Sequence, residues 1–155
     1  MKKFLASVVV LGGFFASSAY AEPITSGVPI QAGNQGCELL AEAVTISLSS
    51  NVFGQYSCNT ETNIMRVATC HKGGSRKKGT VNCAIVNVVD GVNEWNDSSC
   101  SDAKAAAAAA GGEPHVFETD DKGKAFTVST SGGSVGASSL TAPCTGANVL
   151  EDFVD

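Results

Sequence analysis

The sequence predicts a single β-rich α+β domain stapled by disulfides, with about five mainly antiparallel strands and one alanine-rich helix. Three observations support this fold class. Apolar and polar residues alternate over short stretches separated by polar turns, as in strands with one buried face. A run of alanines supplies one helix. All six cysteines follow an N-terminal segment typical of an export signal.

The export segment has three parts in the expected order. Lys2 and Lys3 form a positive start, residues 4–15 are apolar, and Ala19 and Ala21 are the small residues that signal peptidase requires. We therefore expect residues 1–21 to be a signal peptide. The product would be exported, to the periplasm, the cell surface or the medium, where disulfides persist. No later stretch reaches the ~20 apolar residues of a transmembrane helix, so we expect no transmembrane segment.

The remaining 134 residues suffice for one domain. Residues 22–36 are rich in Pro, Gly, Asn and Gln and predict an extended, weakly ordered N-terminal arm. Residues 37–155 would form a single disulfide-stabilised domain. After residue 21, eight basic residues stand against fifteen acidic ones, a balance of −7. This charge argues against nonspecific nucleic-acid binding.

The strands follow from hydrophobic periodicity. Val44, Ile46 and Leu48 alternate with polar residues, and a kink near Asn51 precedes the next stretch. The five expected strands are 44–58, which continues through the kink, 64–70, 80–89, 116–119 and 124–130. The stretch 80–89 is nearly continuously apolar late on, which predicts a central strand. Asp90 and Gly91 form a turn signal.

The last two stretches predict a hairpin. Residues 120–123 (Asp-Asp-Lys-Gly) resemble a four-residue loop, with Gly123 where a positive φ is favoured. This register would place Phe117 opposite Phe126, an aromatic pair worth up to ~1 kcal/mol.

The alanine run 105–110 predicts a helix. Ser99 or Ser101 would cap its start, and Gly111 suits the position after its end. The helix would either pack closely on a sheet, which we favour, or form a low-complexity spacer.

The cysteines are expected to form bridges, because none of their spacings has the Cys-x-x-Cys form of a zinc site. Strand register favours Cys70–Cys83, since a hairpin centred between Arg76 and Lys77 would set these cysteines face to face. The remaining four would pair as Cys37–Cys58 and Cys100–Cys144. We expect no metal and no cofactor.

One motif resembles a catalytic signature. Residues 132–136 (Gly-Gly-Ser-Val-Gly) match the Gly-x-Ser-x-Gly nucleophile elbow. That elbow needs a histidine later in the chain, and both histidines, His71 and His115, precede Ser134. We interpret the stretch as a glycine loop, so no catalytic residue is predicted.

The candidate ligand-binding residues are Lys72, Arg76, Lys77, Lys78 and Trp95. The first four are half of the basic residues after position 21, held within seven positions. They form a positive loop that could bind an anionic glycan or an acidic protein. The alternative is a solvated loop that protects strand ends. The only tryptophan, Trp95, would be either a partly buried anchor or a ligand contact.

Two functional classes follow from this sequence. The first is a non-enzymatic extracellular or cell-surface protein, such as an adhesive or fibre-forming subunit that self-assembles. The second is a small secreted binding protein, an inhibitor or effector, that uses the loop 72–78. A secreted hydrolase is the third alternative, and no specific nucleic-acid binding is expected.

Overall fold

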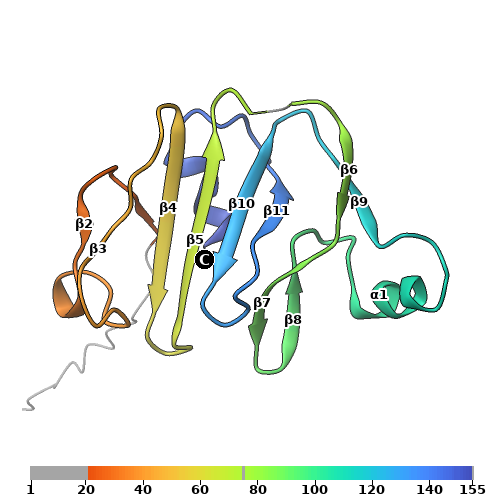
Figure 1. Cartoon of the computed structure of the whole chain (residues 1–155), viewed down its shortest axis with the longest axis horizontal. Coiled ribbons are helices and arrows are strands. Elements are labelled where there is room, and N and C mark those ends of the chain that lie inside the picture. The colour runs from red at the N-terminus through yellow and green to blue at the C-terminus, as the bar shows by residue number, and fades with distance from the viewer. Residues whose placement is uncertain (1–20, 75, 155) are drawn as a thin grey trace, which may run out of the picture.

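The computed structural model describes residues 21–74 and 76–154, and the expected signal peptide lies outside this part up to residue 20. The main sheet is antiparallel and has the strand order β1-β4-β5-β10-β11 (Figure 1). Its strands are β1 (Glu22–Pro23), β4 (Val52–Asn59), β5 (Ile64–His71), β10 (Lys124–Ser129) and β11 (Gly136–Ser139). The predicted β-rich fold class is confirmed.

In the part of the chain that the structure describes, three two-stranded sheets and three short helices accompany the main sheet. The small sheets pair β2 (Pro29–Ile30) with β3 (Val44–Thr45), β6 (Gly79–Asn82) with β9 (Val116–Thr119), and β7 (Ile85–Val89) with β8 (Val92–Trp95). The helices are α1 (Asp102–Ala109) and the 3-10 helices η1 (Gly33–Gln35) and η2 (Ala147–Phe153). Within the described residues, no helix has the length and apolar character needed to cross a membrane.

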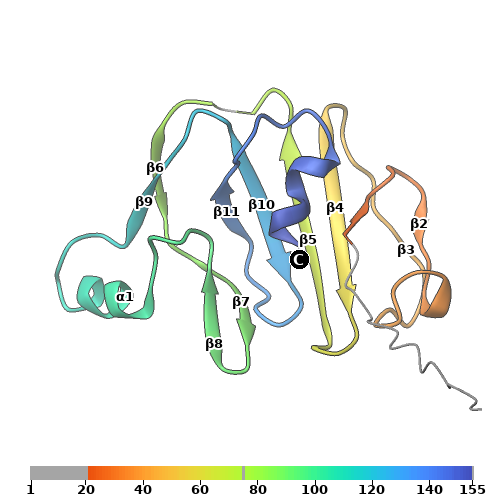
Figure 2. The same cartoon turned by 180° about the vertical axis from the view of Figure 1, so that it is seen from behind.

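The two faces of the main sheet are covered by opposite ends of the chain. Strand register places Ala68, Cys70 and Ala125 on one face, where they pack with Leu150 and Val154. Because η2 crosses this side, we call it the η2 face (Figure 2). On the opposite face, the N-terminal part of the chain packs over β4 and β5, where Ile24 and Ile30 contact the cluster around Tyr56.

The N-terminal arm is an integral part of the fold rather than a weakly ordered extension. β1 pairs with β4, and the Ile24 amide donates to the Gly54 carbonyl at 2.9 Å. Ile24 and Ile30 are buried with Tyr56. Two apolar anchors therefore hold a segment whose composition alone predicted an extended, weakly ordered arm.

The expected strand 80–89 is two strands, and neither belongs to the main sheet. The chain leaves β6 at Cys83, whose amide donates to the His115 carbonyl at 3.0 Å, and Ala84 donates to Asn96 Oδ1 at 2.8 Å. These bonds divert the chain before β7 begins at Ile85.

The central position belongs to β5. β5 pairs with β4 on one side and β10 on the other, so both of its edges are used. A strand has only two hydrogen-bonding edges, and the predicted pairing of 64–70 with 80–89 is therefore wrong.

The predicted hairpin of 116–119 with 124–130 is also wrong. β9 pairs with β6, which sets Phe117 opposite Val81. β10 pairs with β5 and β11, and Phe126 lies opposite Thr69 and Ala137. Phe117 is buried and Phe126 is half exposed, so the two aromatic rings form no cross-strand pair.

The turns and the helix cap agree with the sequence prediction better than the strand pairings do. Asn51 adopts a positive φ of 63° at the expected kink, and Asp90 and Gly91 both have positive φ at the β7–β8 turn. Ser101 caps α1 through its hydroxyl, which accepts from the Lys104 amide, and Gly111 follows the helix with φ 86°. However, α1 has no buried residue, because alanine methyls bury too little area to hold a helix on a sheet.

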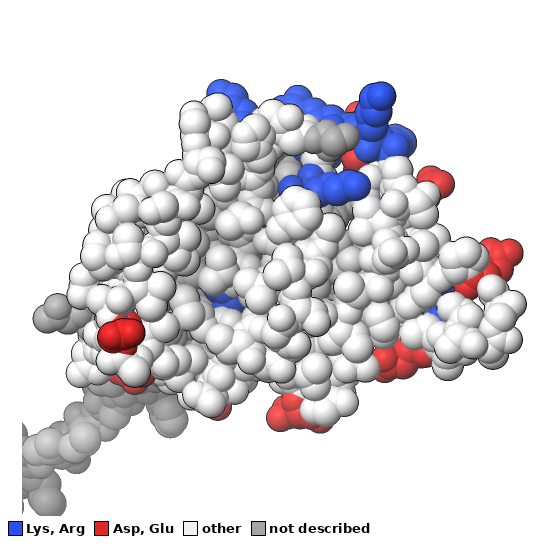
Figure 3. Space-filling model, viewed as in Figure 1, with Lys and Arg blue, Asp and Glu red and all other residues white. Residues whose placement is uncertain are grey.

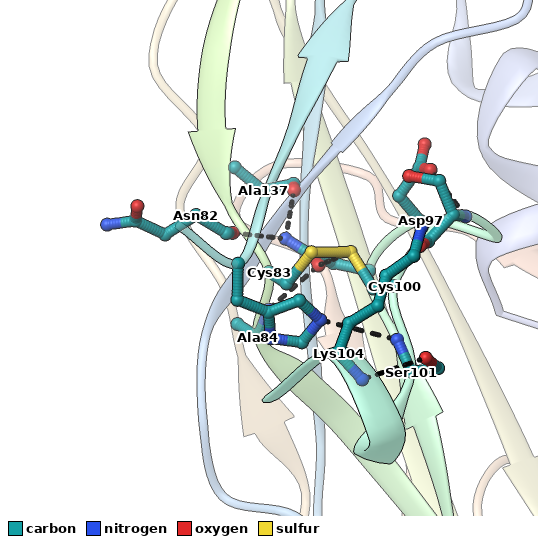
Figure 4. The surroundings of a disulfide bond; sticks show 11 residues. Asn82, Cys83, Ala84, Asp97, Cys100, Ser101, Lys104 and Ala137 are labelled. Carbon is teal, nitrogen blue, oxygen red and sulfur yellow. Dashed lines mark hydrogen bonds between the residues drawn. A yellow bond between two sulfur atoms is a disulfide. The ribbon is translucent and has the colours of Figure 1, made fainter. Parts of the chain in front are cut away.

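The three disulfides confirm one predicted pair and correct two. Cys37–Cys58 forms as expected. The predicted Cys70–Cys83 and Cys100–Cys144 are wrong, because the observed bridges are Cys70–Cys144 and Cys83–Cys100. Cys70 points from β5 into the η2 face, where Cys144 meets it, whereas Cys83 lies beyond the reach of β5 in the break between β6 and β7. Figure 4 shows the Cys83–Cys100 bridge beside the backbone of Asn82, Ala84 and Ala137.

We predict unequal contributions of the bridges to stability. Cys70–Cys144 spans 74 positions and Cys83–Cys100 spans 17. In the chain-entropy model these loops correspond to about 4 and about 3 kcal/mol. Urea unfolding of Cys70→Ala/Cys144→Ala and Cys83→Ala/Cys100→Ala should therefore show the larger loss for the first pair. Peptide mapping without reduction must recover all three observed pairs; a Cys70–Cys83 peptide would contradict this topology.

A second prediction concerns alkaline pH. The Tyr56 hydroxyl donates to Glu22 Oε2 at 2.6 Å, and burial first, then this bond and the Glu22 charge, raise the pKa of Tyr56 to about 12. Because the raised pKa favours the neutral form in the folded state, its stabilisation is present below pH ~10 and is lost as pH rises toward about 12.

Tyrosinate absorbance, taken as the difference between the wild type and Tyr56→Phe, should therefore show a transition well above pH 10. Glu22→Gln should lower the pH of this transition but leave it above the ordinary tyrosine value, because burial remains the larger cause of the raised pKa. A wild-type transition at the ordinary tyrosine value would contradict the docking of β1 beside Tyr56.

Candidate functional site

Basic residues gather at one end of the molecule. Figure 3 shows the Lys and Arg side chains along the edge where the β5–β6 and β9–β10 connections lie. Six of the eight basic residues after position 21 belong to these two connections and the start of β10. We call these six residues the basic end: Lys72, Arg76, Lys77, Lys78, Lys122 and Lys124.

Strand pairing brings the two connections together. Ala125 pairs with Cys70, so Lys124 lies at the level of His71, next to Lys72. At the other limit of the connection, Gly79 pairs with Thr119, so the residues just before β6 and just after β9 are neighbours. The basic end therefore depends on the pairing of β5 with β10 and of β6 with β9.

The β5–β6 connection is fixed at both limits. The Lys72 amide donates to the Asn51 carbonyl at 2.8 Å, and the Gly74 amide donates to the His71 carbonyl at 2.9 Å. At the far limit, Thr119 Oγ1 accepts from the Gly79 amide at 3.2 Å and donates to its carbonyl at 3.1 Å. The charges thus sit on a connection whose start and end are hydrogen-bonded to the sheets.

Two carboxylates, those of Asp120 and Asp121, accompany these cations. Lys122 Nζ lies 3.0 Å from Asp121 Oδ1. Its hydrogen bond and charge lower the pKa of Asp121, with a smaller contribution from Lys78. Both partners are exposed, and such surface pairs contribute little to stability. Strand pairing places the two connections side by side, so their charges act on a common region of the surface.

The charge of the molecule is strongly segregated. The basic end holds six cations and, with Asp120 and Asp121, has a formal charge of +4. The rest of residues 22–155 has two cations and thirteen carboxylates, which gives −11. Lys72, Arg76, Lys77 and Lys78 are exposed, and Lys122 and Lys124 are partly exposed. This arrangement can attract an anionic surface or polymer to one end and repel it elsewhere.

The sequence located four of these six cations. Lys122 and Lys124 were missed because they were assigned to a β9–β10 hairpin far along the chain from the loop 72–78. The predicted location at a rigid hairpin tip held by Cys70–Cys83 is wrong, since the loop instead connects two different sheets. No local signal marks this juxtaposition, because it follows from nonlocal strand pairing.

Trp95 lies away from the basic end, as the last residue of β8. Its ring meets that of His115 edge to face, with centroids 4.7 Å apart, and it is partly buried. The ligand atoms of His115, Cys83 and Cys100 lie within 4.8 Å of one another, an arrangement that could hold a metal if the cysteines were thiolates. The two sulfurs are joined in a disulfide, and His115 Nε2 accepts from the Ser101 amide.

The Gly-x-Ser-x-Gly stretch is a turn between two strands. It connects β10 to β11, whereas a nucleophile elbow joins a strand to a helix. Ser134 is exposed, and the glycines serve packing: a Cβ on Gly136 would lie 2.3 Å from Val86 Cγ1. Gly132 and Gly136 thus allow β7 to approach the main sheet.

Comparison of the chain with protein-family models, curated proteins and solved structures finds no match.

Proposed function

We propose that this chain is an exported, non-enzymatic binding protein whose basic end attaches it to an anionic glycan outside the cell. The observation that carries the proposal is the convergence of six of eight cations on one end of an otherwise acidic molecule. The export segment and three disulfides support an extracellular location.

The residue types favour a polymer of distributed charge. Five of the six cations are lysines, which act as flexible point charges rather than as planar forks for one bound carboxylate or phosphate. They are spread over two neighbouring connections instead of lining a pocket. A sulfated or carboxylated polysaccharide presents repeated charges that such a surface can follow. Long duplex DNA is less suitable, because its charge density would meet the −11 of the remaining surface.

The same segregation supports self-assembly as a second function. A +4 end and an acidic remainder favour head-to-tail contacts between copies, which form filaments when the rotation does not close. Strand addition at β11 is not favoured, because Asn96 Nδ2 already donates to the Ala137 carbonyl there at 2.7 Å. A fibre-forming subunit would therefore associate through charged ends rather than through this sheet edge.

The test uses immobilised heparin as the anionic glycan. The wild type should be retained and eluted by salt. Arg76→Ser/Lys77→Ser/Lys78→Ser should elute much earlier, with the slope of log affinity against log salt reduced by about three, one for each lost contact. Unfolding by urea should be almost unchanged, since exposed charges contribute little to stability.

A matched control separates location from net charge. Lys104→Ser on α1 and Lys72→Ser at the basic end remove one charge each, and only Lys72→Ser should weaken retention. Equal retention of the wild type and the triple variant would contradict the proposal, as would equally tight binding to duplex DNA. Filaments of the wild type at low salt, lost in the triple variant, would favour the subunit function instead.

A further inference from the structure

A groove of about 560 Å³ lies between the η2 face, the β7–β8 hairpin and the end of η2. Its floor is formed by β10 and β11, one wall by β7 and β8, and the other by Asp152 and Phe153 of η2. The volume is within the range of small-molecule sites. Figure 2 shows the three elements that enclose it.

The floor of the groove is unusually polar for a covered sheet face. Strand register puts Thr127, Ser129 and Ser138 on the same face as Ala125, and all three polar residues are at most 6% exposed. Aliphatic side chains would normally occupy such positions, because they gain the most from burial. Hydroxyl groups here give a hydrogen-bonding surface in place of a sealed core.

A hydrogen-bond chain fixes the wall against this floor. Ser129 Oγ donates to Asn87 Oδ1 at 2.7 Å, and Asn87 Nδ2 donates to Glu94 Oε2 at 2.6 Å. Arg66 completes the chain through an ion pair with the same Glu94 oxygen at 3.0 Å. These side chains come from four strands, so the polar groups are held in place before any ligand binds. Such preorganisation lowers the entropy cost of binding.

One hydroxyl on the floor of the groove has no hydrogen-bond partner within the described residues. Thr127 Oγ1 is buried and unpartnered, and Thr127 as a whole is only 6% exposed. Leaving such a group unsatisfied costs about 1–3 kcal/mol. Thr127 lines the groove, so a hydroxylated molecule bound there could satisfy its hydroxyl.

The remaining lining residues indicate the chemical class of the ligand. Glu94, Asp97 and Asp152 give the groove three carboxylates, while Arg66 is its one cation and is paired with Glu94. The carboxylates would repel an anionic ligand, and their oxygens can accept hydrogen bonds from the hydroxyl groups of a neutral one. Trp95 adds an aromatic surface suited to the C–H face of a ring.

We propose that this groove is a second binding site, which takes an uncharged sugar ring. The site goes beyond the glycan-binding basic end, since it differs in location, charge and residue type. The protein would thus bind anionic polymer at one end and a neutral sugar at the groove.

The test uses the fluorescence of Trp95, the only tryptophan in the chain, as a direct reporter of the groove. The probes are glucose, galactose, mannose and N-acetylglucosamine, with spermidine as a cationic comparison. At least one sugar should change the emission saturably at millimolar concentration. Thr127→Val keeps the side-chain shape and removes the unpartnered hydroxyl. This substitution should lower the affinity for that sugar by about five- to tenfold.

Stability distinguishes a ligand-binding hydroxyl from a structural one. Thr127→Val should unfold no more easily than the wild type, because its hydroxyl has no partner to lose. The matched control, Thr119→Val, removes an equally buried hydroxyl that bonds Gly79, so it should lose stability and keep sugar binding.

The proposal is overturned if none of the four sugars alters the emission, if spermidine alone does so, or if Thr127→Val binds as tightly as the wild type. The triple variant of the basic end, Arg76→Ser/Lys77→Ser/Lys78→Ser, should keep full sugar binding. Loss of heparin binding at the basic end and loss of sugar binding at the groove can therefore be told apart.

Discussion

The Cys70–Cys144 bridge is the constraint on which the rest of this structure depends. It joins the central strand β5 to the C-terminal segment across 74 positions, and both cysteines are buried with Leu140 and Leu150. The bridge lies on the η2 face, where the C-terminal chain packs on the sheet. The core around the bridge consists largely of alanine, cysteine and a few aliphatic side chains, so it buries little apolar area. The fold therefore depends on the bridge to hold the C-terminal segment on the sheet. The same packing places η2 where its end forms one wall of the groove.

The η2 face combines an apolar half and a polar half. Around the bridge, Ala68 and Ala125 are fully buried and allow η2 to approach the sheet. Beyond them the face becomes polar at Thr127 and Ser129, and the β7–β8 hairpin replaces η2 as the cover. Gly136 permits this second contact, because any side chain there would collide with Val86. Buried polar groups lower stability unless they form hydrogen bonds. This cost is the physical reason to propose that a ligand supplies the missing hydrogen bond.

Local signals in the sequence were reliable where the physics is local. Backbone strain and capping act within a few residues, so the turn at Asp90–Gly91, the kink at Asn51 and the Ser101 cap of α1 could all be predicted. Strand partners depend on contacts far apart in the chain, and here prediction failed. Cys70 could be placed on a strand with its neighbours, but its partner Cys144 lies in a Ser/Gly-rich stretch with no periodicity to indicate where it folds.

By itself, the sequence determined the β-rich fold class, and it showed a segment typical of an export signal, six cysteines without metal spacing, and a cluster of four cations at 72–78. Only the tertiary structure decided which cysteines pair, brought Lys122 and Lys124 beside that cluster, and enclosed Thr127 and Trp95 in one groove. The reason is the same in each case. Composition and short-range patterns specify what each segment prefers, whereas β5, with two edges to fill, selects its neighbours from the whole chain.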